Sequence, residues 1–153
     1  MRRIGVALTA LGIIGILLVG VGGCAGGASC APAIARGVGL DVLGPAGAVN
    51  DQQLTGSAPL TLGAALVAAP GLQDTGRTGS QLVTKAELNF GDGAGWVDIT
   101  AQQQALGPAF GNSLAQSVQH TYAAAGSYIL QGRVTYWDGQ VLATWNPCTV
   151  TVQ

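Results

Sequence analysis

Alternating apolar and polar residues predict two β-strands and a hairpin turn between residues 118 and 139. Residues that alternate in this way share one face, because successive side chains of a strand point to opposite sides of the sheet. Gly126 gives the backbone freedom needed for the corner between the strands, and the Asp-Gly pair at 138–139 is typical of a hairpin turn. The expected inner face consists of Val118, His120 and Tyr122 in the first strand, and of Tyr128, Leu130, Gly132, Val134 and Tyr136 in the second.

Other segments of the chain show the same period of two. Strands are expected at 38–42, 58–66, 82–90, 96–99 and 140–152. In the strand 82–90 we expect Leu82, Ala86, Leu88 and Phe90 to face inward. In the last strand the apolar residues change from odd to even positions, so a bulge or kink is expected at Asn146-Pro147. Residues 100–112 are expected to form a loop, and no segment after the leader has a helical period. The pattern therefore predicts an all-β domain, with a β-sandwich favoured.

The N-terminal segment is typical of an export signal. Arg2 and Arg3 precede an apolar run from Ile4 to Gly23, which ends at Cys24. This run is also long enough to span a bilayer, so a retained anchor helix is the alternative. The residues before Cys24 resemble the bacterial lipobox, in which the cysteine receives a diacylglyceryl group and the peptide is cut just before it. We therefore expect a signal peptide at 1–23, a lipid on Cys24 that holds the exported chain at a membrane, a tether with a first strand at 24–55, and the sandwich at 56–153.

The cysteines and the charge balance agree with export. If Cys24 carries the lipid, Cys30 and Cys148 remain and can form a disulfide in an oxidising compartment, or else remain two small apolar residues. After removal of the leader, four basic residues stand against seven acidic ones, a net charge of 4 − 7 = −3. Without a cluster of Lys or Arg, such a chain is not expected to bind nucleic acid. No cofactor is expected.

Several ordered motifs resemble the polycystic-kidney-disease (PKD) domain family. They are Gly56-x-Ala58-Pro59-Leu60-Thr61, Phe90-Gly91-Asp92-Gly93 and His120-Thr121-Tyr122-x-x-x-Gly126-x-Tyr128. The resemblance covers residues 56–152. It implies an immunoglobulin-like β-sandwich of the kind found in extracellular proteins. It also implies that His120, Tyr122, Tyr128 and Asp92 form a structural corner.

Candidate chemistry in the sequence points to binding and not to catalysis. His120 is the only histidine, so a Ser-His-Asp triad or a histidine-based metal site has little support. The candidate ligand-binding residues are Trp137, on the expected outer face, and the 100–112 loop with Gln102, Gln103, Gln104 and Phe110. Trp145 is the contrasting case, a ring that covers the sheet near Pro147. We expect a surface protein that binds a protein or carbohydrate ligand, adheres or acts as a spacer. The alternative is an accessory structural subunit of a cell-envelope or secretion assembly.

Overall fold

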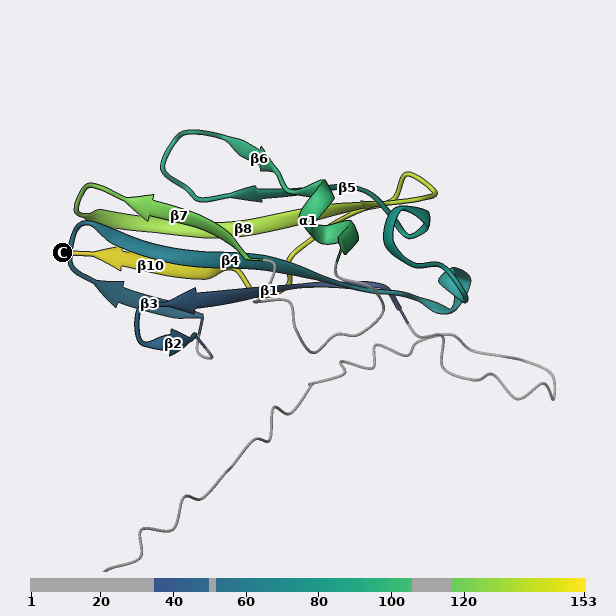
Figure 1. Ribbon diagram of the computed structural model, residues 1–153, viewed down its shortest axis with the longest axis horizontal. Coiled ribbons are helices and arrows are strands. Elements are labelled where there is room, and N and C mark those ends of the chain that lie inside the picture. Colours follow the sequence, from purple (N-terminus) through teal and green to yellow (C-terminus); the bar gives the residue numbers. More distant parts are fainter. Residues whose placement is uncertain (1–34, 50–51, 106–116) are drawn as a thin grey trace, which may run out of the picture. The chain divides into compact units, whose positions relative to one another are not determined.

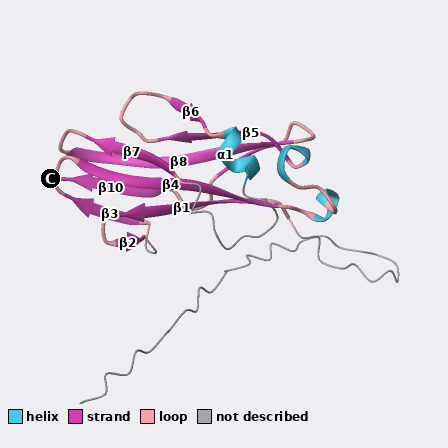
Figure 2. Cartoon of the chain, in the orientation of Figure 1, coloured by secondary structure: helices cyan, strands magenta, loops and turns pink. Residues whose placement is uncertain are grey.

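Two β-sheets pack face to face in the computed structural model, which describes residues 35–49, 52–105 and 117–153 (Figure 1, Figure 2). The first sheet has the strand order β2 (Gly47–Ala48), β1 (Gly37–Gly44), β4 (Leu60–Ala69) and β7 (Val118–Tyr122). The second has the order β3 (Gln53–Gly56), β10 (Cys148–Val152), β8 (Gly126–Tyr136), β5 (Val83–Asn89) and β6 (Trp96–Asp98), and β9 (Val141–Ala143) also pairs with β8. The pairs are antiparallel except β3 with β10, which is parallel.

This strand order defines an immunoglobulin-like sandwich. Strands β1, β4 and β7 form one sheet, and β5, β8 and β10 form the other, as strands A, B, E and C, F, G do in that fold. The expected fold class is therefore confirmed at this level.

Three short helical elements lie between the strands, and one of them replaces part of the loop expected at 100–112. They are the 3₁₀-helices η1 (Leu72–Asp74) and η2 (Gly79–Gln81) and the α-helix α1 (Thr100–Ala105). Asp98 helps to start α1, because its Oδ1 accepts hydrogen bonds from both the backbone N and the hydroxyl of Thr100, at 2.8 and 2.6 Å. Six residues are too few to reveal a helical period, so the pattern of the sequence could not predict this helix.

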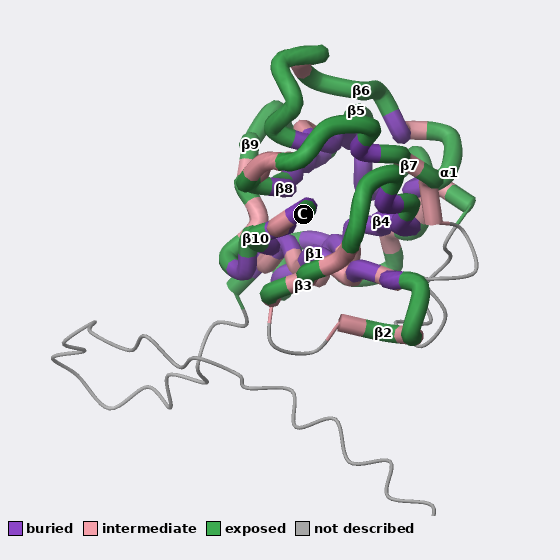
Figure 3. Tube along the Cα trace, turned by 90° about the vertical axis from the view of Figure 1, so that its left-hand side faces the viewer, coloured by how far each residue is buried: buried purple, intermediate pink, exposed green. Residues whose placement is uncertain are grey.

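The core lies between the sheets, where the buried segments gather (Figure 3). The inner positions expected in the longest strands are confirmed: Ala86, Leu88, Phe90, Leu130, Val134 and Tyr136 are at most 2% exposed. At Gly132 the sheets approach so closely that an added Cβ would lie 2.3 Å from Leu66 Cδ2. A side chain at this position would force the buried Leu66 to move.

The sandwich begins earlier in the chain than expected. The predicted first strand is confirmed as β1, which pairs with β4 from Gly37↔Ala69 to Leu43↔Gly63. Its residues Val38, Leu40 and Val42 are at most 4% exposed and belong to the core. The compact unit spans Ile34–Gln153, which begins before the expected bound at residue 56.

The expected kink near Asn146-Pro147 is observed, because the chain bends at residues 145–146 between β9 and β10, but the inward face does not change with it. The even positions Cys148, Val150 and Val152 are buried, and Asn146 continues the same face. The odd apolar residues Val141 and Trp145 face outward and are 55% and 71% exposed, so Trp145 touches the sheet at Gly39 but covers less of it than we expected. The side chain of Asn146 instead bonds both backbone groups of Leu40 in β1, with Leu40 N donating to Oδ1 at 2.8 Å and Nδ2 donating to Leu40 O at 2.9 Å. Residues 144–147, which separate β9 from β10, therefore lie beside the edge of β1.

The leader, Cys24 and Cys30 lie outside the described residues, so the signal peptide, the lipid and the disulfide remain predictions. Cys148, in β10, is 1% exposed. Among the residues that the structure describes, no helix is long and apolar enough to cross a membrane.

Candidate functional site

A network of buried charge lies at the end of the sandwich where the described chain begins. We call this region the entry end and define it by Arg36, Leu72, Asp74, Arg77 and residues 136–140. Arg36 donates from Nε to Asp74 Oδ2 at 2.7 Å and from a terminal nitrogen to Asp74 Oδ1. Its other terminal nitrogen lies 2.8 Å from both carboxylate oxygens of Asp138 and from Oε1 of Gln140. The guanidinium stacks on the ring of Tyr136, 4.3 Å from its centroid.

The electrostatics of the entry end favour a fixed, fully ionised cluster. The hydrogen bonds from Arg36 hold the pKa of Asp74 well below its usual range, with help from Trp137 and the backbone of Gly71. The same guanidinium lowers the pKa of Asp138. Burial raises the pKa of Tyr136 to about 12, so its hydroxyl keeps its proton and lies 3.0 Å from the carbonyl oxygens of both Gly37 and Ala69. None of these groups changes protonation near neutral pH, so the cluster is suited to holding the chain and not to transferring protons.

Trp137 is on the surface of this network. Its ring is 40% exposed, its Nε1 donates to Asp74 Oδ1 at 2.8 Å, and the guanidinium of Arg77 lies 3.8 Å from its ring centroid. The outward position expected for Trp137 is therefore observed, with the ring held in one orientation by Asp74 and Arg77. Its role in binding remains a prediction.

The glutamines that we expected in an open binding loop lie in α1 instead. Gln103 is only 8% exposed, and Gln104 donates from Nε2 to Val83 O at 2.9 Å, which ties α1 to β5. Gln102 is exposed. Phe110 lies outside the described residues. The described part of the 100–112 segment is thus a helix docked on the sandwich, and two of its three glutamines are not a free surface.

The four expected corner residues come together at the other end of the sandwich, near the C-terminus (Figure 1). His120 stacks on Phe90 with ring centroids 4.0 Å apart, and its Nε2 lies 3.1 Å from Asp92 Oδ2, without the alignment of a hydrogen bond. Tyr128 makes the tyrosine corner, because its hydroxyl donates to Ala124 O at 2.9 Å, four residues upstream.

Tyr122 donates across the sandwich to Phe90 O at 2.8 Å, and burial raises the pKa of its hydroxyl. It therefore fixes the turn after β5, where Gly91 has φ +76° and faces the backbone of Ile129.

The outer face of the second sheet carries a surface that the sequence reading missed. We call it the Trp96 face, made up of Lys85, Glu87, Trp96, Ile129, Arg133 and Val141. Arg133 donates from Nε to Glu87 Oε2 at 2.8 Å and stacks on Trp96, 4.2 Å from the ring centroid. Trp96, Ile129 and Val141 are 38%, 57% and 55% exposed. Ile129 and Val141 occupy the outward register of their strands, but single exposed apolar residues are common on protein surfaces, so the sequence alone gave no clear signal for this face.

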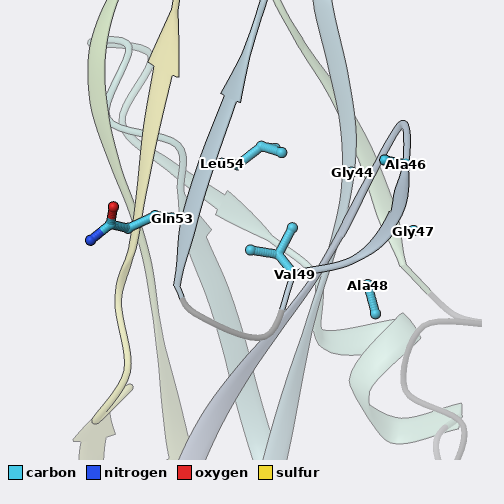
Figure 4. Close-up of a pocket in the computed structure, with 7 residues that line it drawn as sticks. All are labelled: Gly44, Ala46, Gly47, Ala48, Val49, Gln53 and Leu54. Carbon is cyan, nitrogen blue, oxygen red and sulfur yellow. The ribbon is translucent and has the colours of Figure 1, made fainter.

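The hollow beside the β1–β2 hairpin carries no catalytic chemistry. Figure 4 shows that it lies between this hairpin and β3, lined by Gly44, Ala46, Gly47, Ala48, Val49, Gln53 and Leu54. None of these side chains ionises or acts as a nucleophile. Among the described residues, no three His, Cys, Asp or Glu side chains are grouped so that they could hold a metal ion.

Comparison with known proteins adds little to this picture. No family model and no curated protein matches the chain. Among solved structures, it is similar to the fibronectin(III)-like modules of CbhA from Clostridium thermocellum, with 18% identity and a TM-score of 0.37. That match covers 72% of this chain and 93% of the other. The fold class given above follows from the strand order of this chain itself.

Proposed function

We propose that this chain is an exported lipoprotein whose PKD-like sandwich is a binding module without enzymatic activity. In this proposal a lipid on Cys24 holds the chain at a membrane, and the Trp96 face binds the partner. The observation that supports binding is the exposed ring of Trp96, stacked by Arg133, with Ile129 exposed on the same sheet surface. Charged residues make up only 8% of the chain, so a partner is recognised by shape, aromatic contact and neutral hydrogen bonds.

The composition of the Trp96 face favours a protein partner. Tryptophan and arginine are the residues that most often dominate the energy of protein interfaces. Here Arg133 is already held against Trp96 and Glu87, so little side-chain entropy is lost on binding. A glycan is the alternative ligand, and it would stack on the ring of Trp96. The experiment below distinguishes the two.

The binding proposal is tested by replacing Trp96. Photo-crosslinking from position 129 in intact cells should capture a partner, and Trp96→Ala should abolish that capture while the melting temperature changes little. Trp145→Ala is the matched control, because Trp145 is more exposed but lies over Gly39 of the other sheet, with Nε1 3.7 Å from where a Cβ would be. If the Trp96→Ala variant still captures the partner, and the purified protein retains no glycan, then the Trp96 face is not the binding site.

The lipid anchor is tested separately. The wild-type chain should incorporate labelled palmitate and enter the detergent phase, and Cys24→Ser should lose both properties. Unchanged labelling in Cys24→Ser would exclude the lipoprotein assignment. Membrane association without labelling in either protein would favour the retained anchor helix.

A further inference from the structure

The entry end is the part of the sandwich closest along the chain to the proposed anchor. Arg36 is fixed there by Asp74 and Asp138, and β1 then runs away from it toward the other end (Figure 1). From Cys24 to Arg36 there are 36 − 24 = 12 residues, and twelve residues reach at most about 40 Å even when fully extended. A lipid on Cys24 therefore keeps the entry end within that distance of the bilayer surface.

The exposed side chains of the entry end suit the interface of a bilayer. Leu72 is 51% exposed and Trp137 is 40% exposed. Leu72 lies in the same short helix, η1, as Asp74, and the indole N–H of Trp137 donates a hydrogen bond to Asp74. Tryptophan is enriched at the headgroup level of membranes, where one part of its ring is apolar and the other polar. Arg77 stacks on the same ring, and a guanidinium binds phosphate well.

The charges of the entry end do not oppose such contact. Arg36 and Arg77 balance Asp74 and Asp138, so the four groups sum to 2 − 2 = 0. Asp74 is fully buried, and Asp138 is held by Arg36. Within the described ranges no carboxylate forms an ion pair with Arg77. Its charge is therefore available to a lipid phosphate.

From these observations we infer that the entry end rests on the surface of the bilayer, with Leu72 and Trp137 at the headgroup level and Arg77 on lipid phosphates. The inference rests on the proposed anchoring at Cys24. Anchoring makes the contact intramolecular, with an effective concentration on the order of millimolar, so a small patch is sufficient. Trp96 is then directed away from the membrane, because it pairs with Asn89 at the far end of β5.

Tryptophan fluorescence tests this arrangement, since the whole chain contains three tryptophans. The mature lipidated protein, residues 24–153, is reconstituted into phosphatidylcholine vesicles, with or without lipid whose acyl chains are brominated close to the headgroups. The variant with Trp96→Phe and Trp145→Phe keeps Trp137 alone and should lose most of its emission to the brominated lipid. The matched variant with Trp137→Phe and Trp145→Phe keeps Trp96 alone and should lose none. Adding Leu72→Ser to the first variant should restore much of the Trp137 emission.

Flotation of the same vesicles separates failure of the inference from failure of the proposed anchoring. Protein that floats with the vesicles but shows equal emission from Trp137 in both lipids is anchored without docking, and the inference is then wrong. Equal quenching of Trp137 and Trp96 would also contradict it, because the sandwich would then have no preferred end at the membrane. Protein that does not float overturns the anchoring and the docking together.

Discussion

At the scale of single residues, the stability of the entry end depends on one buried guanidinium. The side chains of Arg36 and Asp74 are 2% and 0% exposed, so each charge has lost its water and depends on the other. Such a pair adds little net stability compared with apolar residues, but removal of one partner leaves an uncompensated charge in the interior. The ring of Tyr136 beneath Arg36 and the indole of Trp137 on Asp74 fix the geometry of the pair.

Replacement of Asp74 tests this dependence. Asp74→Asn keeps the shape of the side chain but leaves Arg36 without its buried partner, so the free energy of unfolding should fall by about 3–5 kcal/mol. Asp138→Asn is the control, since that side chain is 35% exposed and screened by solvent, so its loss should be much smaller than that of Asp74→Asn. Urea unfolding at pH 7 measures both. Equal losses in the two variants would contradict a special role for the buried pair.

The pH dependence of the same variants follows from the lowered pKa of Asp74. A carboxyl that is more acidic in the folded state stabilises the fold above its unfolded pKa of about 4, and that stabilisation is lost as the pH falls toward the folded pKa. The free energy of unfolding of the wild type should therefore decrease below about pH 4. Asp74→Asn should show a shallower decrease, which does not vanish because Glu87, Asp98 and Asp138 also have lowered pKa values.

The sequence could not show that Arg36 is buried. Its partners lie 38 and 102 residues away, so nothing in the neighbouring residues marks it, and a basic residue just after a Gly- and Ala-rich stretch is typical of a tether. Trp137 was predictable as an outward residue from its parity within 118–139, but the contacts with Asp74 and Arg77 were not. The corner residues His120, Tyr122 and Tyr128 were predictable, because they lie close together in the sequence and form a recognisable motif.

At the scale of elements, alternation predicted most strands correctly and failed in the last segment. The prediction assumed that apolar residues mark the inner face. In β9 and the segment after it the outward positions are held by Val141 and Trp145, while the inward position 146 is a buried asparagine. A buried amide is stable there because its oxygen and its nitrogen both form hydrogen bonds with the backbone of Leu40. These bonds also provide partners for the backbone N–H and C=O of Leu40 on the open edge of β1.

Replacement of Asn146 tests this bridge between the sheets. Asn146→Ala leaves the buried N–H and carbonyl of Leu40 without their side-chain partner, at a cost of about 1–3 kcal/mol in the free energy of unfolding. Hydrogen exchange at the Leu40 amide should accelerate more than exchange in β5. Trp145→Ala, one residue away and exposed, should change stability by about 0.5 kcal/mol or less. A large loss for Trp145→Ala with none for Asn146→Ala would restore the expectation that Trp145 covers the sheet.

At the scale of the whole molecule, the sequence predicted a sandwich but placed its start too late. Strand β1 was expected only as a segment within the tether, because its alternation of Gly, Val, Leu and Asp is short and its neighbours are loops. Its membership of the core depends on pairing with β4, and that register is a long-range property. The motifs that resemble the PKD family begin at Gly56, so they gave no information about the residues before it.

Two fragments test where the domain begins. The fragment 34–153 should fold, with dispersed amide resonances and a cooperative thermal transition. The fragment 56–153 lacks Val38, Leu40 and Val42, each of which contributes about 1.5–3 kcal/mol by burial. The summed loss of about 5–9 kcal/mol is comparable to the whole stability of a typical domain, so this fragment should be unfolded or aggregated. It would also expose the edge of β4 that pairs with β1, which favours association with other chains. A cooperative transition in 56–153 at a temperature near that of 34–153 would show that β1 is dispensable and that the domain begins where the motifs begin.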